Sequence, residues 1–159
     1  MIKLWMAPHG LHIEPGQPAD AEVMARLHAQ GFFRGWPRED FDSFLSEAGT
    51  PAYVACDARR RVAGFALVRV LADEAELITI AVDPKWRKKG VGTALMRAMF
   101  DDLKLTAARR LLLEVAADNP NAIRLYKGFG FAQIGERQAY YARSDGSPAS
   151  ALVMARDLG

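Results

Sequence analysis

The hydrophobic pattern changes its period about a third of the way along this 159-residue chain, and this change constrains the fold most strongly. Over residues 18–30 and 37–49, apolar residues recur at three- and four-residue spacing, which predicts two helices. Over residues 52–56, 62–71 and 76–82 the pattern becomes extended, with short turns between segments, which predicts three consecutive antiparallel strands. The chain is therefore expected to pack helices against an antiparallel sheet.

The C-terminal half alternates helices and strands. Val91, Leu95, Met99 and Leu103 recur every four positions, which predicts an amphipathic helix over residues 90–105. The other predicted segments are a first strand at 11–14, a strand at 111–116, a helix at 121–128 and closing strands at 129–134 and 151–154. This order predicts an α/β fold of the α+β kind, with a mostly antiparallel central sheet of about six to seven strands flanked on both faces by about four helices.

The length suits one domain, residues 11–159, and leaves no room for a second. Residues 1–10 precede it as an N-terminal extension, and their apolar start fits either a short docking segment or a loosely ordered tail.

Charge and cysteine content exclude several classes of function. A formal net charge of +2, from 21 basic and 19 acidic residues, is too small for a wrapped nucleic acid or an anionic membrane as the main partner. The longest apolar run falls far short of the ~20 residues that cross a bilayer. Cys56 is the single cysteine, so no internal disulfide forms, and the Cys/His spacing of a zinc site is missing. We expect a cytoplasmic protein without a metal, either a monomer or a weak homodimer.

A glycine turn after the predicted strand at residues 76–82 carries the main functional signal. Residues 78–82 form the end of that strand, and the loop behind it reads Arg87-x-x-Gly90-x-Gly92 at the start of a helix. Glycine lets backbone approach a ligand closely, and the free N–H groups of a helix start favour an anion. Arg87, Lys88 and Lys89 add positive charge. The predicted ligand is a phosphate group.

Two common phosphate turns do not fit this segment. A Walker turn ends in Gly-Lys-Ser/Thr, whereas Gly92 is followed by Thr93. The dinucleotide fingerprint needs glycine where Leu95 stands, and a parallel strand–helix–strand unit around it. The turn resembles instead the acyl-CoA pyrophosphate turn of the GNAT (GCN5-related N-acetyltransferase) superfamily. Taken alone, it is also compatible with an ordinary helix start that contains two glycines.

A second segment strengthens the resemblance. Residues 112–131, from the strand that carries Glu114 through Asn119 to Tyr126 and Gly130-Phe131, resemble the second half of the same superfamily. Over residues 11–158 the chain is most similar to bacterial ribosomal-protein-alanine N-acetyltransferases of the RimI type. Arg87 stands where glutamine is common in this pattern, Lys89 departs from it likewise, and residues 1–10 have no counterpart.

The resemblance implies roles for individual residues. The general base falls on Glu114 and the general acid on Tyr126. Acetyl-CoA is the implied cosubstrate, and its contacts fall on Ile80, Ala81, Val82, Arg87, Lys88, Lys89, Gly90, Val91, Gly92, Thr93, Asn119 and Tyr126. Tyr140 and Tyr141 would help to hold a peptide amino terminus, and Trp36 is a further candidate for the amine's approach.

These residue types suit acetyl transfer to an amine. An amine is largely an ammonium ion near pH 7, so a carboxylate such as Glu114 has to remove a proton. The N–H of Val82 can stabilise charge that develops on the carbonyl oxygen, and a tyrosine can protonate the leaving thiolate. Without the resemblance, Glu114 is equally well a solvent-facing glutamate and Tyr126 a core tyrosine. We expect the two groups on one side of the sheet, with the thioester between them.

The predicted function is an acetyl-CoA-dependent N-acetyltransferase that acts on the N-terminal α-amine of a protein, such as a ribosomal protein, by direct transfer in a ternary complex. Two alternatives stay open: an enzyme for a small amine (an amino acid or an antibiotic), and a non-catalytic acyl-CoA-binding module. A nucleotide-binding module is the remaining possibility outside this superfamily.

Overall fold

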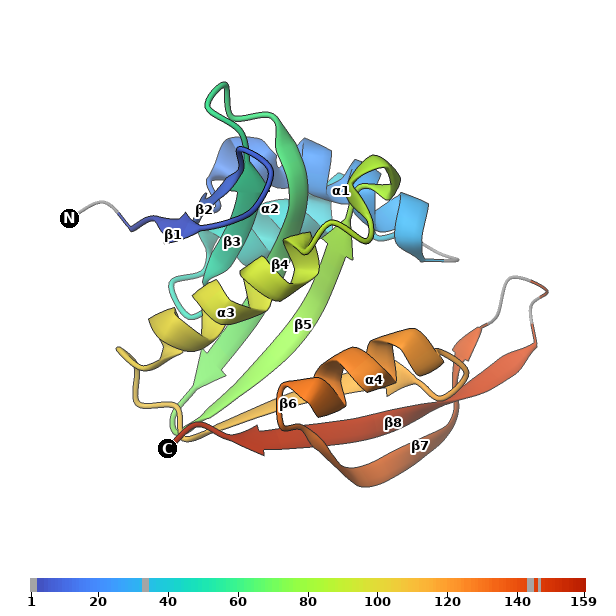
Figure 1. Ribbon diagram of the computed structural model, residues 1–159. Helices are drawn as coiled ribbons and strands as arrows, with labels where there is room; N and C mark the ends of the chain where they lie inside the picture. Colours follow the sequence, from blue (N-terminus) through green and yellow to red (C-terminus); the bar gives the residue numbers. More distant parts are fainter. Residues whose placement is uncertain (1–2, 33–34, 143–144, 146) are drawn as a thin grey trace.

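The computed structural model describes residues 3–32, 35–142, 145 and 147–159, with the side chains of residues 139–142 outside the described part. Its centre is an eight-stranded sheet with the order β1-β2-β3-β4-β5-β6-β8-β7 (Figure 1). The strands are β1 (Trp5–Met6), β2 (His12–Pro15), β3 (Ala52–Cys56), β4 (Val62–Leu71), β5 (Glu74–Val82), β6 (Arg110–Ala116), β7 (Ala132–Ala142) and β8 (Pro148–Asp157). Neighbouring strands run antiparallel except β5 and β6, which are parallel.

Helices cover the sheet from both faces, as predicted. They are α1 (Ala21–Gly31), α2 (Arg38–Ser46), α3 (Val91–Leu103) and α4 (Pro120–Gly128), with short 3-10 turns η1 (Pro18–Asp20) and η2 (Pro84–Trp86). In Figure 1, α3 and α4 lie in front of the sheet and α1 and α2 behind it. The predicted α/β fold, with a mostly antiparallel sheet flanked by four helices, is confirmed.

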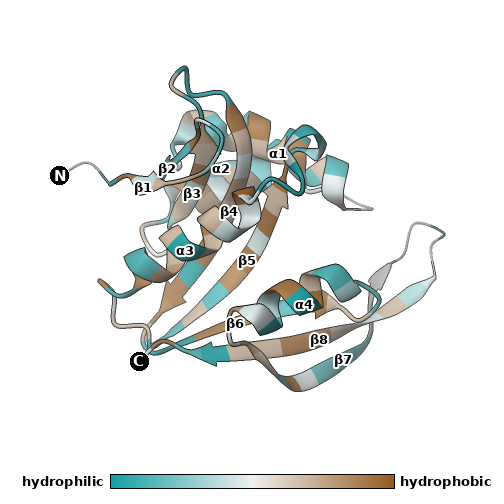
Figure 2. Cartoon of the chain, viewed as in Figure 1, coloured by the Kyte–Doolittle hydropathy of each residue, from teal (hydrophilic) through white to brown (hydrophobic). Residues whose placement is uncertain are grey.

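Alternation of side chains along the strands builds one core layer on each face. The layer under α3 and α4 contains Ala66, Leu95 and Leu113, among others. The layer under α1 and α2 contains Leu67 and Phe41. All five residues of β3 are buried, because helices cover both of its faces. Figure 2 shows the matching concentration of hydrophobic residues in β3 and β4.

The predicted bounds of two strands need correction. The strand predicted at 129–134 begins only at Ala132, because Phe129 and Gly130 end α4, Gly130 with a φ of +88°. It continues to Ala142, and β8 extends well beyond the predicted 151–154 on both sides. Residues 132–138 of β7 are exposed or half-exposed at successive positions, and β8 departs from strict alternation, so the sequence shows no clear strand pattern there.

The N-terminal extension joins the sheet as β1, which pairs with β2 through Trp5↔Ile13 and Met6↔His12. Trp5 Nε1 donates a hydrogen bond to Asp101 at the end of α3 (2.9 Å). Lys3 Nζ contacts Asp102 Oδ1 at 2.8 Å. The docking interpretation of the extension is therefore the one that fits the described residues 3–10.

The sheet splits between β5 and β6, and this split positions the site. The two strands pair only over Glu74–Leu77 and Arg110–Leu113, whereas β5 continues to pair with β4 as far as Val82. Beyond Leu77 they diverge, as Figure 1 shows. The gap opens at the C-terminal ends of both strands, next to the start of α3.

Among the described residues, no helix combines the length and the hydropathy that a membrane span requires.

Candidate active site

The predicted phosphate turn lies between η2 and α3. Asp83 caps η2, accepting a hydrogen bond from the Lys85 N–H (3.0 Å). Gly90 is the N-cap of α3 and has a φ of +81°, in the left-handed region that favours glycine. The first intrahelical bond runs from the Ala94 N–H to the Gly90 carbonyl (3.0 Å). The preceding N–H groups therefore form the electropositive end of a 13-residue helix.

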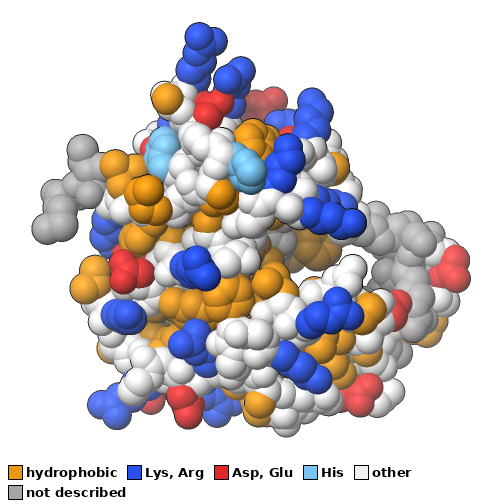
Figure 3. All heavy atoms as spheres, viewed as in Figure 1, with side chains coloured by type: hydrophobic (Ala, Val, Ile, Leu, Met, Phe, Trp, Pro, Cys, Tyr) orange, Lys and Arg blue, Asp and Glu red, His pale blue; other side chains and the backbone are white. Residues whose placement is uncertain are grey.

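The space in front of this turn suits a pyrophosphate. A Cβ added to Gly92 would meet no protein atom within 4 Å, so the backbone there is open to a ligand. Arg87, Lys88 and Lys89 are exposed at the rim, with Lys89 Nζ 5.3 Å from the Trp86 ring centre. In Figure 3, hydrophobic side chains line the depression between α3 and α4, and lysine and arginine side chains surround it. Together these features fit an anionic ligand with an apolar arm, such as a coenzyme A thioester.

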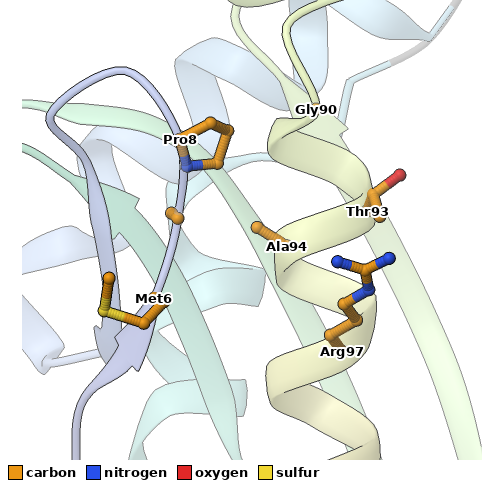
Figure 4. Close-up of a pocket in the computed structure, with 7 residues that line it drawn as sticks. Met6, Pro8, Gly90, Thr93, Ala94 and Arg97 are labelled. Carbon is orange, nitrogen blue, oxygen red and sulfur yellow. The ribbon is translucent and has the colours of Figure 1, made fainter.

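A second hollow adjoins the same turn on its other side. It has a volume of about 400 Å³ and lies between the N-terminal extension and α3. Figure 4 shows Pro8 of the extension facing Gly90 and Ala94, while Thr93 and Arg97 project from the other side of the helix. The extension thus forms a wall beside the phosphate turn.

The apolar arm has a defined edge to lie along. Ile80 and Val82 are half-buried in the layer under α3, and Ala81 is buried on the other face. All three lie in the part of β5 that has separated from β6. Their backbone therefore lies along the gap between the two strands.

Glu114 lies on β6 just beyond the last residue that pairs with β5. Its neighbours Leu113 and Val115 are buried in the layer under α3 and α4, so Glu114 belongs to the opposite face. Its side chain is 21% exposed and forms an ion pair with Arg137 of β7, with Oε1 and Nε 3.0 Å apart. It borders a groove of about 600 Å³ on that face, together with Arg69, Leu112 and Val153.

Tyr126 is buried on the face of α3 and α4, with its ring centre 5.9 Å from that of Phe131. The expectation that Glu114 and Tyr126 share one side of the sheet is therefore wrong. That expectation treated the sheet as continuous, whereas β5 and β6 stop pairing beyond Leu77 and Leu113.

Comparison with known proteins identifies the family. The model of the Acetyltransferase (GNAT) family matches residues 21–131, more than half of the chain. The chain belongs to this family. It is 41% identical over 138 residues to the [ribosomal protein bS18]-alanine N-acetyltransferase of Escherichia coli (strain K12), covering 87% of this chain and 88% of the relative. A putative enzyme of the same name from Bacillus subtilis (strain 168) is 31% identical over 122 residues, 77% of this chain and 81% of the relative.

Solved structures support the same family. The crystal structure of the Escherichia coli ribosomal-protein-S18-alanine N-acetyltransferase superposes with a TM-score of 0.87 at 30% identity, covering 94% of each chain. Ard1 from Thermoplasma volcanium gives a TM-score of 0.83 at 29% identity, covering 94% of this chain and 98% of that one. The protein is an acetyl-CoA-dependent N-acetyltransferase, which confirms the predicted enzyme class and cosubstrate.

Asn119 has a structural task in this GNAT domain. It is the N-cap of α4, and its Oδ1 accepts a hydrogen bond from the Ala122 N–H at 3.2 Å. Pro120 follows at the first helical position. The predicted contact between Asn119 and acetyl-CoA stays a prediction.

Trp36 stacks on a histidine that the sequence analysis did not single out. Its ring lies 4.4 Å from His28, which also stacks on Phe32 at 4.2 Å. The Trp36 N–H donates to His28 Nδ1 (3.2 Å). Burial lowers the pKa of His28 to about 4, so the imidazole is neutral at pH 7. His28 thus orders the segment that carries Trp36, and only its position on the apolar side of a predicted helix could have indicated this.

The tyrosine pair can be placed only by its backbone. Tyr140 and Tyr141 belong to β7, and Tyr141 pairs with Ala149 of β8. Their side chains lie outside the described residues, so their role in substrate binding stays a prediction.

Proposed function

We propose that this acetyltransferase acetylates the N-terminal α-amine of a protein, and that its substrate is a ribosomal protein in the cytoplasm. The names of its relatives support this substrate, since several are alanine N-acetyltransferases of ribosomal protein bS18. The observation that carries the proposal is the split sheet: a cosubstrate can lie on the face of α3 and α4 while an acceptor chain approaches Glu114 from the other face.

Acetyl-CoA supplies an activated thioester carbonyl. We assign the pyrophosphate to the N–H groups of Val91, Gly92 and Thr93, with Gly90 shaping the turn and Arg87, Lys88 and Lys89 adding charge. Asn119 would lie beside the cosubstrate at the start of α4. Ile80, Ala81 and Val82 would hold the acetyl and pantetheine arm along the open edge of β5.

Glu114 is the proposed general base. The ion pair with Arg137 orients one carboxylate oxygen, which leaves the second oxygen to take a proton from the substrate ammonium. The neutral amine then forms the new C–N bond, and its nitrogen releases a second proton to solvent to become the amide. The Val82 N–H is the proposed donor to the carbonyl oxygen while that atom gains negative charge.

Tyr126 is the proposed general acid. As the C–S bond breaks, its phenol gives a proton to the departing thiolate and regains one from solvent. The acetyl group passes directly to the amine, without an acyl-enzyme. Trp36, Tyr140 and Tyr141 are the proposed walls of the acceptor site.

Acceptor specificity tests the proposal. Purified protein with acetyl-CoA would be given a peptide that begins with alanine, the same peptide with a blocked amino terminus and an internal lysine, and free small amines. We expect thiol release with the first peptide only, and mass spectrometry should locate the acetyl group on its α-amine. Faster turnover of a small amine would make the small-molecule alternative correct. No turnover with any acceptor, despite coenzyme A binding, would favour the non-catalytic module.

A further inference from the structure

Three side chains of types that can ligate a metal meet on β2 and β3, away from the acetyl-transfer site. His12 Nε2 lies 2.7 Å from Glu14 Oε2 and 3.5 Å from Cys56 Sγ. The three ligand atoms all lie within 4.8 Å of one another. No other group of three such side chains was found in the part of the chain that the structure describes.

Strand register brings these residues together. His12 and Cys56 are directly opposite partners in the antiparallel pair β2–β3, so their side chains leave the same face. Glu14, two residues after His12 on β2, points to that face as well. This contact across 44 residues explains why the sequence showed no spacing typical of a zinc site.

We propose that His12, Glu14 and Cys56 form a binding site for a single Zn²⁺ ion. Imidazole nitrogen, carboxylate oxygen and thiolate sulfur are the three ligand types that Zn²⁺ takes in proteins, and a water completes the tetrahedron. On binding, the thiol of Cys56 loses its proton to solvent, and His12, whose Nε2 faces the Glu14 carboxylate in the metal-free site, binds through Nε2 with its proton moved to Nδ1. The fourth position faces outward, because the His12 and Glu14 side chains are 30% and 21% exposed.

The distances suit this ion. Bond lengths of about 2.0 Å to nitrogen and about 2.3 Å to sulfur imply a nitrogen–sulfur separation of about 3.5 Å in a tetrahedral site, which is the observed spacing. The nitrogen–oxygen spacing has to widen by about 0.6 Å, which small rotations of the two half-exposed side chains can supply.

Charged side chains around the three ligands hold the carboxylate of Glu14 in place. Arg60 Nε donates to Glu14 Oε1, the oxygen that is not turned toward His12. Arg60 is held in turn by the buried carboxylate of Asp20. Outer contacts of this kind orient a ligating carboxylate. The charges balance, because Zn²⁺ neutralises the Cys56 thiolate and Glu14 while Arg60 neutralises Asp20.

The position of the proposed site predicts that the metal stabilises the fold and takes no part in acetyl transfer. Strands β3, β4 and β5 separate β2 from β6, which carries Glu114. A metal here would tie β2 to β3 and stabilise the sheet edge next to β1. Acetyl transfer should not require it, so failure of this site and failure of the proposed function are separate results.

The direct test is metal binding by the tag-free, reduced protein. We expect one Zn²⁺ per chain, and Co²⁺ in its place should give tetrahedral visible bands with a thiolate-to-cobalt absorption. Excess Zn²⁺ should raise the melting temperature by about 5 °C or more. Absence of stoichiometric uptake would overturn the proposal and leave the cluster as a hydrogen-bond network.

Variants locate the metal. His12→Gln retains a hydrogen bond to Glu14 and should weaken Co²⁺ binding at least tenfold, while Cys56→Ser should remove the thiolate absorption. The matched control is His9→Gln, an exposed histidine of the extension, which should bind as the wild type does. Unchanged Co²⁺ spectra in His12→Gln and Cys56→Ser would show that the metal binds elsewhere. Loss of acetyl transfer on chelation would contradict the structural role.

Discussion

The two sides of the split sheet are built differently. On the N-terminal side, β3 and β4 are buried over nearly continuous stretches because helices cover both faces. On the C-terminal side, β6 alternates strictly between buried and half-buried residues, with α4 on one face and the groove at Glu114 on the other. A doubly covered scaffold therefore meets a singly covered one at the gap between β5 and β6.

This difference indicates how a small domain can hold two substrates. The doubly covered part of the sheet, β1 to β5, is called the thick side below, and the singly covered part, β6 to β8, the thin side. The thick side supplies a rigid edge of β5 and the start of α3, which suit a large anionic cosubstrate. The thin side leaves one sheet face open for an acceptor. If this division is correct, changes beside the groove on the thin side should affect catalysis, and changes in the core of the thick side, away from β5 and the start of α3, should mainly affect stability.

The largest expected effect is that of Glu114→Gln on the thin side. Glutamine keeps the shape and a hydrogen bond to Arg137 but cannot accept the ammonium proton, so kcat/KM should fall by about 10³-fold at pH 7. The loss should shrink above pH 8, where an α-amine is already neutral. Thiol release across this pH range measures both effects.

Exposed Glu136 on β7 offers the matched control, and Glu136→Gln should retain wild-type kcat/KM. A Glu114→Gln enzyme that keeps its activity but melts at a lower temperature would show that Glu114 serves only the ion pair. In that case the thin side would not carry the base.

The next largest effect concerns His28 on the thick side. Burial holds its pKa at about 4, whereas the unfolded chain takes up this proton near pH 6.5. The neutral, buried form therefore stabilises the fold fully above pH 6.5, and the contribution is lost as the pH falls toward 4. The gap between the two pKa values corresponds to about 3 kcal/mol.

Denaturant unfolding of wild type and His28→Phe at pH 7 and pH 4.5 measures this contribution of His28 to the free energy of unfolding. The phenyl ring preserves the stacking, so the variant should lose less stability than wild type over this interval. His9→Gln, which changes an exposed histidine, should follow the wild type. Parallel curves for His28→Phe and wild type would mean that His28 is protonated in the fold.

Tyr126→Phe tests the proposed general acid, which lies on the other face of the sheet from Glu114. The ring should keep its place against Phe131 while the enzyme loses the proton donor, so kcat should fall by about 10²-fold with little change in the KM for the amine. Steady-state kinetics at saturating acetyl-CoA measures this. A fall in stability with kcat unchanged would assign Tyr126 to the core alone.

Sequence patterns predicted the thick side better than the thin side. The bounds of β3 and β4 matched the predicted segments because their apolar runs stop at a turn, where Asp57 Oδ1 accepts hydrogen bonds from the N–H groups of Arg59 and Arg61. In β7, Gln133, Glu136 and Arg137 are exposed, so the strand resembles a loop and its length was underestimated. Because residues 132–138 are all exposed or half-exposed, this part of β7 has no buried face whose hydrophobic pattern the sequence could show.

The site was predictable where the signal is local. The glycines at 90 and 92 indicated the phosphate turn because positive φ and an open backbone are properties of single residues. The opposite faces of Glu114 and Tyr126 could not be predicted, because the face of the sheet that α4 covers depends on packing over the whole domain. The meeting of His12 with Cys56 depends likewise on strand register.

The smallest effect should come from the ion pair between Lys3 of the N-terminal extension and Asp102 of α3. Asp102 is nearly buried and accepts hydrogen bonds from the Tyr53 hydroxyl at 2.6 Å and from Lys3 at 2.8 Å. Because the Lys3 side chain is 46% exposed, Lys3→Met should lower the free energy of unfolding by less than about 1 kcal/mol. Tyr53 still satisfies the carboxylate in this variant. Denaturant unfolding measures the change.

Lys104→Met, at an exposed lysine just after α3, is the matched control and should leave stability unchanged. A loss above about 2 kcal/mol for Lys3→Met would exceed what a half-exposed ion pair contributes. The extension would then belong to the scaffold as firmly as β2 does, since Trp5 and Lys3 both hold it to the end of α3. A small loss instead means that Trp5 and the pairing of β1 with β2 hold the extension without Lys3.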